Sequence, residues 1–285
     1  MENLNCTGAI HQNITEGRYD GIIWCILPTV IIVPPLALPA NALVIRLLLG
    51  KPGICCTSEI FTLQLAVFDM LFCLMILTEY IRFLCFQTLE TSNFVAWSLN
   101  QAGGPLLLCF VGLDCYVGVC HPLVFLRLKD PTLRLSVCFV VNAVTAVSCY
   151  LIKFNKIFKW TAVSIVLIFT LVVISTCNIL ILKSLRQAGP SGKEVHPVKK
   201  RAFKIVLTSF VLVNIHYLPS VLEFLLKTLL PCLFSPFSAF TSVTFTVLSL
   251  SSVVQPLCYL ARTKQLQKIR CQRSSAAETK ATATV

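Results

Sequence analysis

Seven separate apolar stretches, each long enough to cross a lipid bilayer as an α-helix, constrain the fold of this chain more than any other feature. A hydrocarbon core about 30 Å thick is crossed by about 20 consecutive apolar residues. Only the second stretch contains Asp, Glu, Lys or Arg, and charged residues make up just 13% of the chain. The stretches are residues 21–45, 60–84, 91–113, 135–152, 160–182 and 205–222 and one helix within 228–261. We therefore predict an all-α membrane protein, a seven-helix transmembrane bundle surrounded by the lipid bilayer.

The distribution of positive charge predicts the orientation of this bundle. Eighteen of the 24 Lys and Arg residues lie at or beside alternate loops and in the C-terminal tail, which the positive-inside rule places in the cytoplasm. Asn5 and Asn13 each begin a glycosylation sequon, and such sites are used only on the outer side. Both features place the N-terminus outside. We expect an extracellular glycosylated tail (residues 1–21), a transmembrane domain (22–262) and a cytoplasmic tail (263–285).

The 15 cysteines do not form the framework of a small disulfide-rich protein, because most lie in or below the predicted membrane. Five of them map to the outer side, and the odd count leaves at least one thiol free. A Cys6–Cys232 bond would tie the N-terminal tail to the last outer loop, and Cys85–Cys149 is a second candidate pair; Cys25 is the fifth. The connectivity stays open at this point.

No motif for catalysis or metal binding is present in the sequence. The four histidines are scattered, no Cys or His pair stands at zinc-binding spacing, and no hydrolase or phosphate-loop motif occurs. The formal net charge of +12 arises from residues between apolar stretches, without the aromatic residues that accompany nucleic-acid binding. We predict neither an enzyme nor a metal site, and no nucleic-acid partner.

Acidic residues inside the apolar stretches need partners, because an unpaired charge in the bilayer is costly. Asp69 is the most deeply placed. Polar residues on three other predicted helices could meet it: Asn41, Asn100, Ser251, Ser252 and Gln255. Such a cluster would hold a proton or a small cation, for example a structural sodium ion. A neutral, hydrogen-bonded Asp69 that only fixes helix packing is an equally good interpretation.

Basic residues gather at the predicted outer mouth of the bundle: Arg82, Lys153, Lys156, Lys159 and Lys227. This excess of positive charge favours an anionic extracellular ligand. Two alternatives compete with that interpretation. The three lysines between residues 153 and 159 could simply extend to the membrane surface, and Glu79 and Arg82, three residues apart on one helix, could pair with each other.

Several short motifs occur in a set order along the chain. Leu38-Pro39-Ala40-Asn41 is followed by Leu65-Ala66-Val67-Phe68-Asp69 and then by Asp114-Cys115-Tyr116, which precedes His121-Pro122-Leu123. His216-Tyr217-Leu218-Pro219 and Gln255-Pro256-Leu257-Cys258-Tyr259 come later. Together they resemble the motifs of the rhodopsin-like G-protein-coupled receptors, over residues 22–271.

This resemblance implies a plasma-membrane receptor that binds a small extracellular ligand and signals through a heterotrimeric G protein. In such a bundle, Tyr217, Pro219, Pro256 and Tyr259 shift on activation, and Asp114, Cys115 and Tyr116 stand where the G protein couples. Residues 262–271 resemble the family's short amphipathic eighth helix, and Cys271 is a candidate palmitoylation site. The short third inner loop resembles that of purinergic, protease-activated and lipid receptors, which implies a nucleotide or lipid ligand. Trp97 stands where amine receptors place an Asp.

Departures from the family pattern define the alternatives. Cys115 replaces the Arg of the third-helix motif, Asn178 replaces a Tyr and Tyr217 replaces a Trp. These changes favour a divergent, non-signalling or decoy receptor as the alternative function. A transporter or channel would also explain intramembrane acids, but the sequence shows no internal repeat of the kind those folds use.

Overall fold

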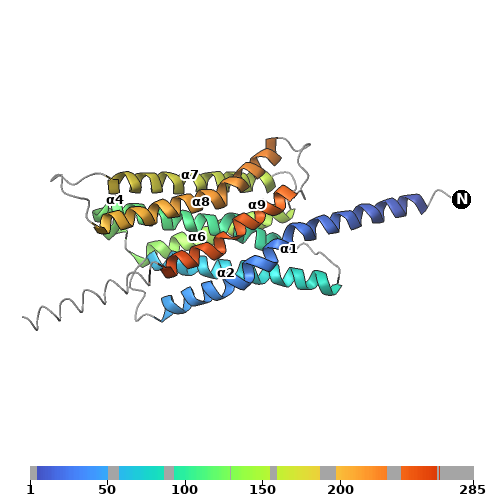
Figure 1. Ribbon diagram of the computed structural model, residues 1–285, viewed down its shortest axis with the longest axis horizontal. Helices are drawn as coiled ribbons and strands as arrows, with labels where there is room; N and C mark the ends of the chain where they lie inside the picture. Colours follow the sequence, from blue (N-terminus) through green and yellow to red (C-terminus); the bar gives the residue numbers. More distant parts are fainter. Residues whose placement is uncertain are drawn as a thin grey trace, which may run out of the picture.

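The computed structural model describes residues 5–50, 58–86, 93–128, 130–154, 159–186, 197–229, 239–261 and 263. These residues form helices and short turns, and no strand occurs among them. Seven of the helical segments described are long and apolar enough to cross a membrane. They lie side by side as one elongated bundle (Figure 1). The predicted all-α fold with seven spans is therefore confirmed, whereas the placement of the N-terminus outside stays a prediction.

Five of the spans are single helices. They are α1 (Asn5–Leu49), α2 (Ser58–Phe86), α6 (Pro131–Phe154), α7 (Lys159–Arg186) and α8 (Pro197–Leu229). The third span is divided into α3 (Asn93–Ser98), η1 (Leu99–Gly103) and α4 (Gly104–Cys120), and the short α5 (Pro122–Arg127) follows it. The last is α9 (Ala239–Ser249), which continues after a turn at Leu250 as a second helical piece, residues 251–261. We call Phe240–Ala261 the C-terminal span.

Helix α1 begins far earlier than the apolar stretch that predicts it. Its backbone is helical from Asn5, so the segment predicted as an extracellular tail continues directly into the first span. In Figure 1 this part of α1 projects beyond the rest of the bundle. The side chains of Asn5, Cys6 and Asn13 are outside the described part of the chain, as are residues 264–285 with Cys271 and most of the predicted eighth helix.

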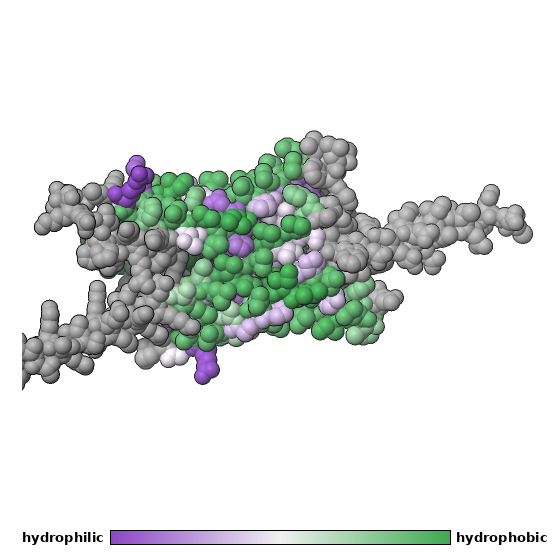
Figure 2. Space-filling view, in the orientation of Figure 1, coloured by the Kyte–Doolittle hydropathy of each residue, from purple (hydrophilic) through white to green (hydrophobic). Residues whose placement is uncertain are grey.

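Apolar side chains lie both inside the bundle and on its outer surface. Phe72 and Leu107 are fully buried in one core cluster, and Leu167, Tyr217 and Leu248 are buried in another. Many large apolar side chains are also exposed, and the face of the bundle in Figure 2 is largely hydrophobic (green). Helices that are apolar on all sides are typical of membrane spans.

The third span contains an irregularity that the apolar pattern does not predict. Residues Leu99–Gly103 form a π-helical turn in place of regular α-helix. Pro105 has no backbone N–H, so it cannot donate to the carbonyl four residues earlier, and the helix widens just before it. Gly103 lies at this point because a Cβ there would meet the Phe68 ring at 2.5 Å and Thr145 Oγ1 at 2.9 Å. The absence of a side chain thus lets the third span approach α2 and α6 closely.

Candidate functional site

Asp69 lies at the centre of a buried polar cluster between α2 and the C-terminal span. Its side chain is buried, and Ser252 Oγ donates a hydrogen bond to Asp69 Oδ1 at 2.7 Å. The second carboxylate oxygen, Oδ2, has no hydrogen-bond partner among the described residues. The cluster therefore has an unused acceptor in the interior of the bundle.

Asn41 joins α1 to this cluster through a backbone defect in the C-terminal span. Pro256 has no N–H, so the carbonyl of Ser252, four residues earlier, loses its ordinary helical donor. Asn41 Nδ2 donates to that carbonyl at 3.0 Å and to the carbonyl of Ala37 in its own helix at 2.9 Å. The amide thus satisfies a buried acceptor that the proline leaves open, and it ties α1 to the C-terminal span.

Asn100 approaches the C-terminal span from the π-helical turn. Its Nδ2 atom donates to Ser249 Oγ at 3.0 Å, and both residues are buried. Ser249 is not among the residues predicted for the cluster, although it begins the serine-rich run that also contains Ser251 and Ser252. Of the five partners predicted for Asp69, only Ser252 bonds to it directly; Asn41 and Asn100 are linked to the same span one contact further out.

A cavity of about 190 Å³ lies next to this cluster, between α2, α4, α7, α8 and the C-terminal span. Gln255 Nε2 lies 3.5 Å from the Tyr217 hydroxyl across the cavity, at the long limit of a hydrogen bond. Gln255 Oε1 has no partner within the described part of the chain. The polar lining comprises Thr62, Cys115, Asn178, His216, Tyr217, Ser251, Gln255 and Tyr259. Three of the seven residues that the resemblance assigns to switching or G-protein coupling, Cys115, Tyr217 and Tyr259, thus line this cavity.

Asp114 has a partner that the sequence did not reveal. Arg134, on α6, donates to its two carboxylate oxygens at 2.5 and 3.3 Å, and Arg134 Nε reaches the carbonyl of Leu128 at 3.4 Å. The guanidinium is buried and lies 5.7 Å from the ring centroids of both Phe61 and Phe125. Asp114 is therefore paired, although the residue next to it is Cys115 and not an arginine.

The sequence did not point to Arg134 as a partner of Asp114, because Arg134 lies next to a basic loop and was counted among the residues that predict orientation. Its position within a helix, after Pro131, was the available signal. On the same side of the bundle, the hydroxyl of Tyr116 lies 3.1 Å from His121 Nε2, at the break between α4 and α5. Cys115 is exposed and lines the cavity.

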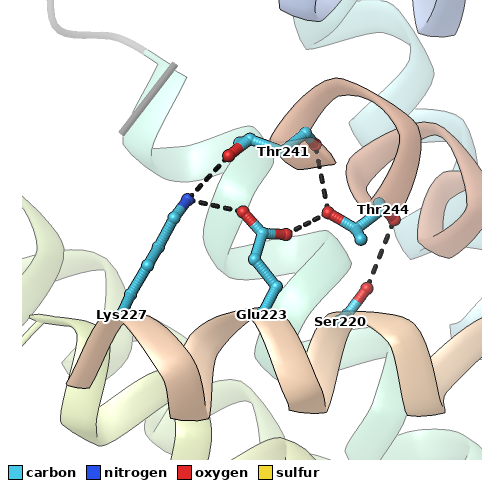
Figure 3. Close-up of polar contacts among 5 residues, drawn as sticks. All are labelled: Ser220, Glu223, Lys227, Thr241 and Thr244. Carbon is cyan, nitrogen blue, oxygen red and sulfur yellow. Dashed lines mark hydrogen bonds and ion pairs between the residues drawn. The ribbon is translucent and has the colours of Figure 1, made fainter. Parts of the chain in front are cut away.

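A second buried polar cluster joins α8 to α9 (Figure 3). Lys227 Nζ lies 2.5 Å from Glu223 Oε1 and donates to Thr241 Oγ1 at 2.9 Å. Thr244 Oγ1 donates to Glu223 Oε2, and Ser220 Oγ donates to the carbonyl of Thr244 at 3.2 Å. Lys227, predicted at the ligand mouth, is only 7% exposed. Its charge is balanced inside the bundle because Glu223, one helical turn earlier, faces the same side of α8.

The other residues of the predicted mouth have mixed environments. Arg82 Nη1 lies 3.6 Å from Glu79 Oε1, so the pairing of these two residues is confirmed. Lys153 Nζ lies 5.0 Å from the ring centroid of Phe154, and Trp97 stacks on Phe245 with ring centroids 4.5 Å apart. Lys156 and the side chain of Lys159 are outside the described residues.

The cysteine predictions are only partly covered by the structure. Cys85 and Cys149 are both free thiols, so the candidate bond between them is absent. The physical reason is their level along the helices: Cys85 is next to the end of α2, whereas Cys149 lies more than a turn inside α6. Cys232 and the side chains of Cys6 and Cys25 are outside the described residues. Among the residues described, no group of His, Cys, Asp and Glu could hold a metal ion by their side chains alone.

The geometry defines a class: a multi-pass membrane protein whose seven spans enclose two polar clusters and a cavity. Comparison with protein-family models and with curated protein sequences found no match to this chain.

Proposed function

We propose that this chain is a cell-surface receptor of the rhodopsin-like type, which converts binding of a small extracellular ligand into a signal through a heterotrimeric G protein. The observation that carries the proposal is the meeting of Asn41, Asp69 and Ser252 in one network. These residues come from three spans that are far apart in the sequence, and Asn41 and Asp69 belong to separate motifs of the resemblance. Convergence of separated motifs is what a shared structural role requires.

The proposed mechanism is a shift between two packings of the bundle. Ligand contacts at the outer end bias α8 against the C-terminal span, and the cavity beside Tyr217 and Gln255 widens toward the cytoplasm for the G protein. The 3.5 Å separation of these two side chains supports this location, because a hydrogen bond at the long limit of the distance range is weak and costs little to break. A ligand needs a differential affinity of about 5.5 kcal/mol to move such an equilibrium from 1:99 to 99:1.

The ligand class follows from the excess of basic residues at the predicted outer end. Glu223 balances Lys227, and Glu79 pairs with Arg82. Lys153, Lys156 and Lys159 add three more positive charges to the sequence at that end, which supports an anionic ligand such as a nucleotide or a lipid headgroup.

A sodium ion fits the Asp69 cluster in its donor set. Asp69 Oδ2 is a buried oxygen without a partner among the described residues, and the Ser252 hydroxyl is adjacent to the same carboxylate. Oxygen ligands of this kind suit a hard cation, which would neutralise the carboxylate. We expect Asp69→Asn to abolish any sodium dependence of ligand binding, and sodium dependence that survives in this variant would assign Asp69 to packing alone.

The receptor proposal is tested with the full-length chain carrying a different epitope at each end. Intact cells should bind antibody only to the N-terminal epitope; labelling of both epitopes on one face would refute it. Nucleotides and lysophospholipids are then screened for thermal stabilisation of the purified chain. If the chain is a receptor, a stabilising compound should accelerate nucleotide exchange on a purified G protein. Uptake of the compound into sealed vesicles that contain the chain would instead indicate a transporter.

A non-signalling or decoy receptor is the second candidate, and the environment of Cys115 favours it. The cation that would meet the G protein is replaced by a thiol, and Asp114 is held by Arg134 on α6. A decoy would bind a stabilising compound without nucleotide exchange. In that case Cys115→Arg should raise exchange, whereas Cys120→Arg, at the end of the same helix, should not. An unchanged response to Cys115→Arg would mean that this replacement is not what limits coupling.

A further inference from the structure

One polar site on the bundle faces outward, into the region that lipid would occupy. Asn142 is exposed in the middle of α6, and the same face of this helix carries Leu135, Phe139 and Tyr150, each more than half exposed. At a rise of 1.5 Å per residue, Asn142 is about 16 Å from the Pro131 end of α6. That places its amide inside a hydrocarbon layer about 30 Å thick.

Asn142 is joined to α2 by a hydrogen bond that leaves half of the amide pair unused. Gln64 Nε2 donates to Asn142 Oδ1 at 2.6 Å. Neither Asn142 Nδ2 nor Gln64 Oε1 has a hydrogen-bond partner among the described residues. The pair therefore presents a free donor group and a free acceptor side by side on an exposed surface. Lipid tails cannot bond to either, so both carry a free-energy cost in the bilayer.

A donor and an acceptor on one patch are self-complementary under two-fold symmetry. When two copies of the chain meet across this patch, Asn142 Nδ2 of each copy can donate to Gln64 Oε1 of the other. Hydrogen bonds of this kind between amide side chains are a known source of helix association in membranes. Ala146, exposed one turn after Asn142 on the same face of α6, adds little bulk and allows the two helices to come close.

We propose that the face formed by Gln64 and Asn142 is the interface of a homodimer in the membrane, with the two amide pairs at its centre. The inference does not depend on the receptor function, because it concerns only the outer surface of α2 and α6. The single hydrogen bond between Gln64 and Asn142, with its unused donor and acceptor, carries the inference.

The test measures the dimer fraction of full-length chain in sterol-free phosphatidylcholine vesicles, by energy transfer between labelled copies at several protein-to-lipid ratios. The Gln64→Leu/Asn142→Leu double variant removes both amides and leaves no unsatisfied polar group, so it should fold. We expect its dissociation constant to be at least about tenfold higher than that of the native chain. Val147→Leu, an exposed position on another side of α6, is the matched control and should dimerise like the native chain.

Crosslinking locates the interface. Ala146→Cys should crosslink between copies, whereas Val147→Cys should not, with the native chain giving the background from its own thiols. A native chain that is monomeric at all ratios would overturn the proposal, as would equal dimerisation of the double variant or equal crosslinking at both positions. A sterol probe that photolabels this face while the chain stays monomeric would assign the patch to a sterol hydroxyl instead.

Discussion

The buried ion pair between Glu223 and Lys227 makes a quantitative prediction about stability. Both side chains are almost fully buried, so they differ from a surface pair, which contributes only about 0.2–1 kcal/mol. Lys227→Met keeps most of the apolar stem but removes the charge. It leaves the Glu223 carboxylate buried without its cation, and breaking a buried pair in this way costs about 3–5 kcal/mol. We therefore expect the free energy of unfolding of this variant to fall by about that amount.

The double variant Glu223→Gln/Lys227→Met separates the charge from the packing. With both charges removed, the glutamine carbonyl can still accept the hydrogen bond from Thr244, and no carboxylate is left uncompensated. Replacing a buried pair by neutral groups of similar size is often neutral or stabilising. We expect the double variant to recover most of the stability that the single variant loses.

The buried native cysteines allow unfolding to be measured without introducing labelling sites. Cys73, Cys109, Cys138 and Cys177 are buried free thiols that react with a thiol dye only when the bundle opens. Unfolding is followed by this reaction in lipid nanodiscs. Lys153→Met, the same change at an exposed residue near the same end of the bundle, is the matched control and should shift stability by less than about 0.5 kcal/mol. A double variant as unstable as Lys227→Met would refute the reasoning, because the loss would then come from packing and not from charge.

Two further substitutions test the close contacts of the core with the same thiol assay. Gly103→Ala places a Cβ 2.5 Å from the Phe68 ring and should lower the free energy of unfolding by about 1–3 kcal/mol. Gly112→Ala, whose nearest neighbour is 3.9 Å away, should not cause this loss. Equal effects of the two variants would contradict the close approach of the third span to α2. Asn41→Leu leaves the carbonyl released by the proline of the C-terminal span unsatisfied and should cost about 1–3 kcal/mol. Asn214→Leu, which loses only a bond within its own helix, should cost less, and an equal or larger loss would contradict the role given to Asn41.

The number and type of helices were predictable because the membrane imposes a length and an absence of charge on every span. The residues at which the helices begin and end were less predictable. Helix α1 extends back to Asn5 and α4 continues to Cys120, because helix can continue past the apolar stretch wherever no residue stops it. The π-helical turn was not predicted either. It depends on how Gly103 packs against Phe68 and Thr145, which are distant in the sequence.

The candidate site was predictable as a set of residue types but not as a set of pairs. Burial of a carboxylate requires a partner, so the sequence correctly indicated that Asp69 would meet polar groups of other helices. Which group satisfies which acid depends on helix rotation. Ser252 lies against Asp69, and Lys227 turns inward to Glu223 where the charge pattern favoured an outward position. The pairing of Arg134 with Asp114 was not predicted for the same reason, because the two residues lie on different helices.

Both the backbone and the serines of the C-terminal span explain why polar contacts gather there. The missing donor at Pro256 releases the Ser252 carbonyl for Asn41, and the hydroxyls of Ser249 and Ser252 make the contacts with Asn100 and Asp69. Asn41, Asp69 and Asn100 each bond to a serine of this span, and each bond comes from a different neighbour in the bundle. A rotation of the span about its axis would break all three contacts together, because the serines lie within one turn of each other. These contacts therefore couple the position of the C-terminal span to α1, α2 and the third span, as the proposed shift between two packings of the bundle needs.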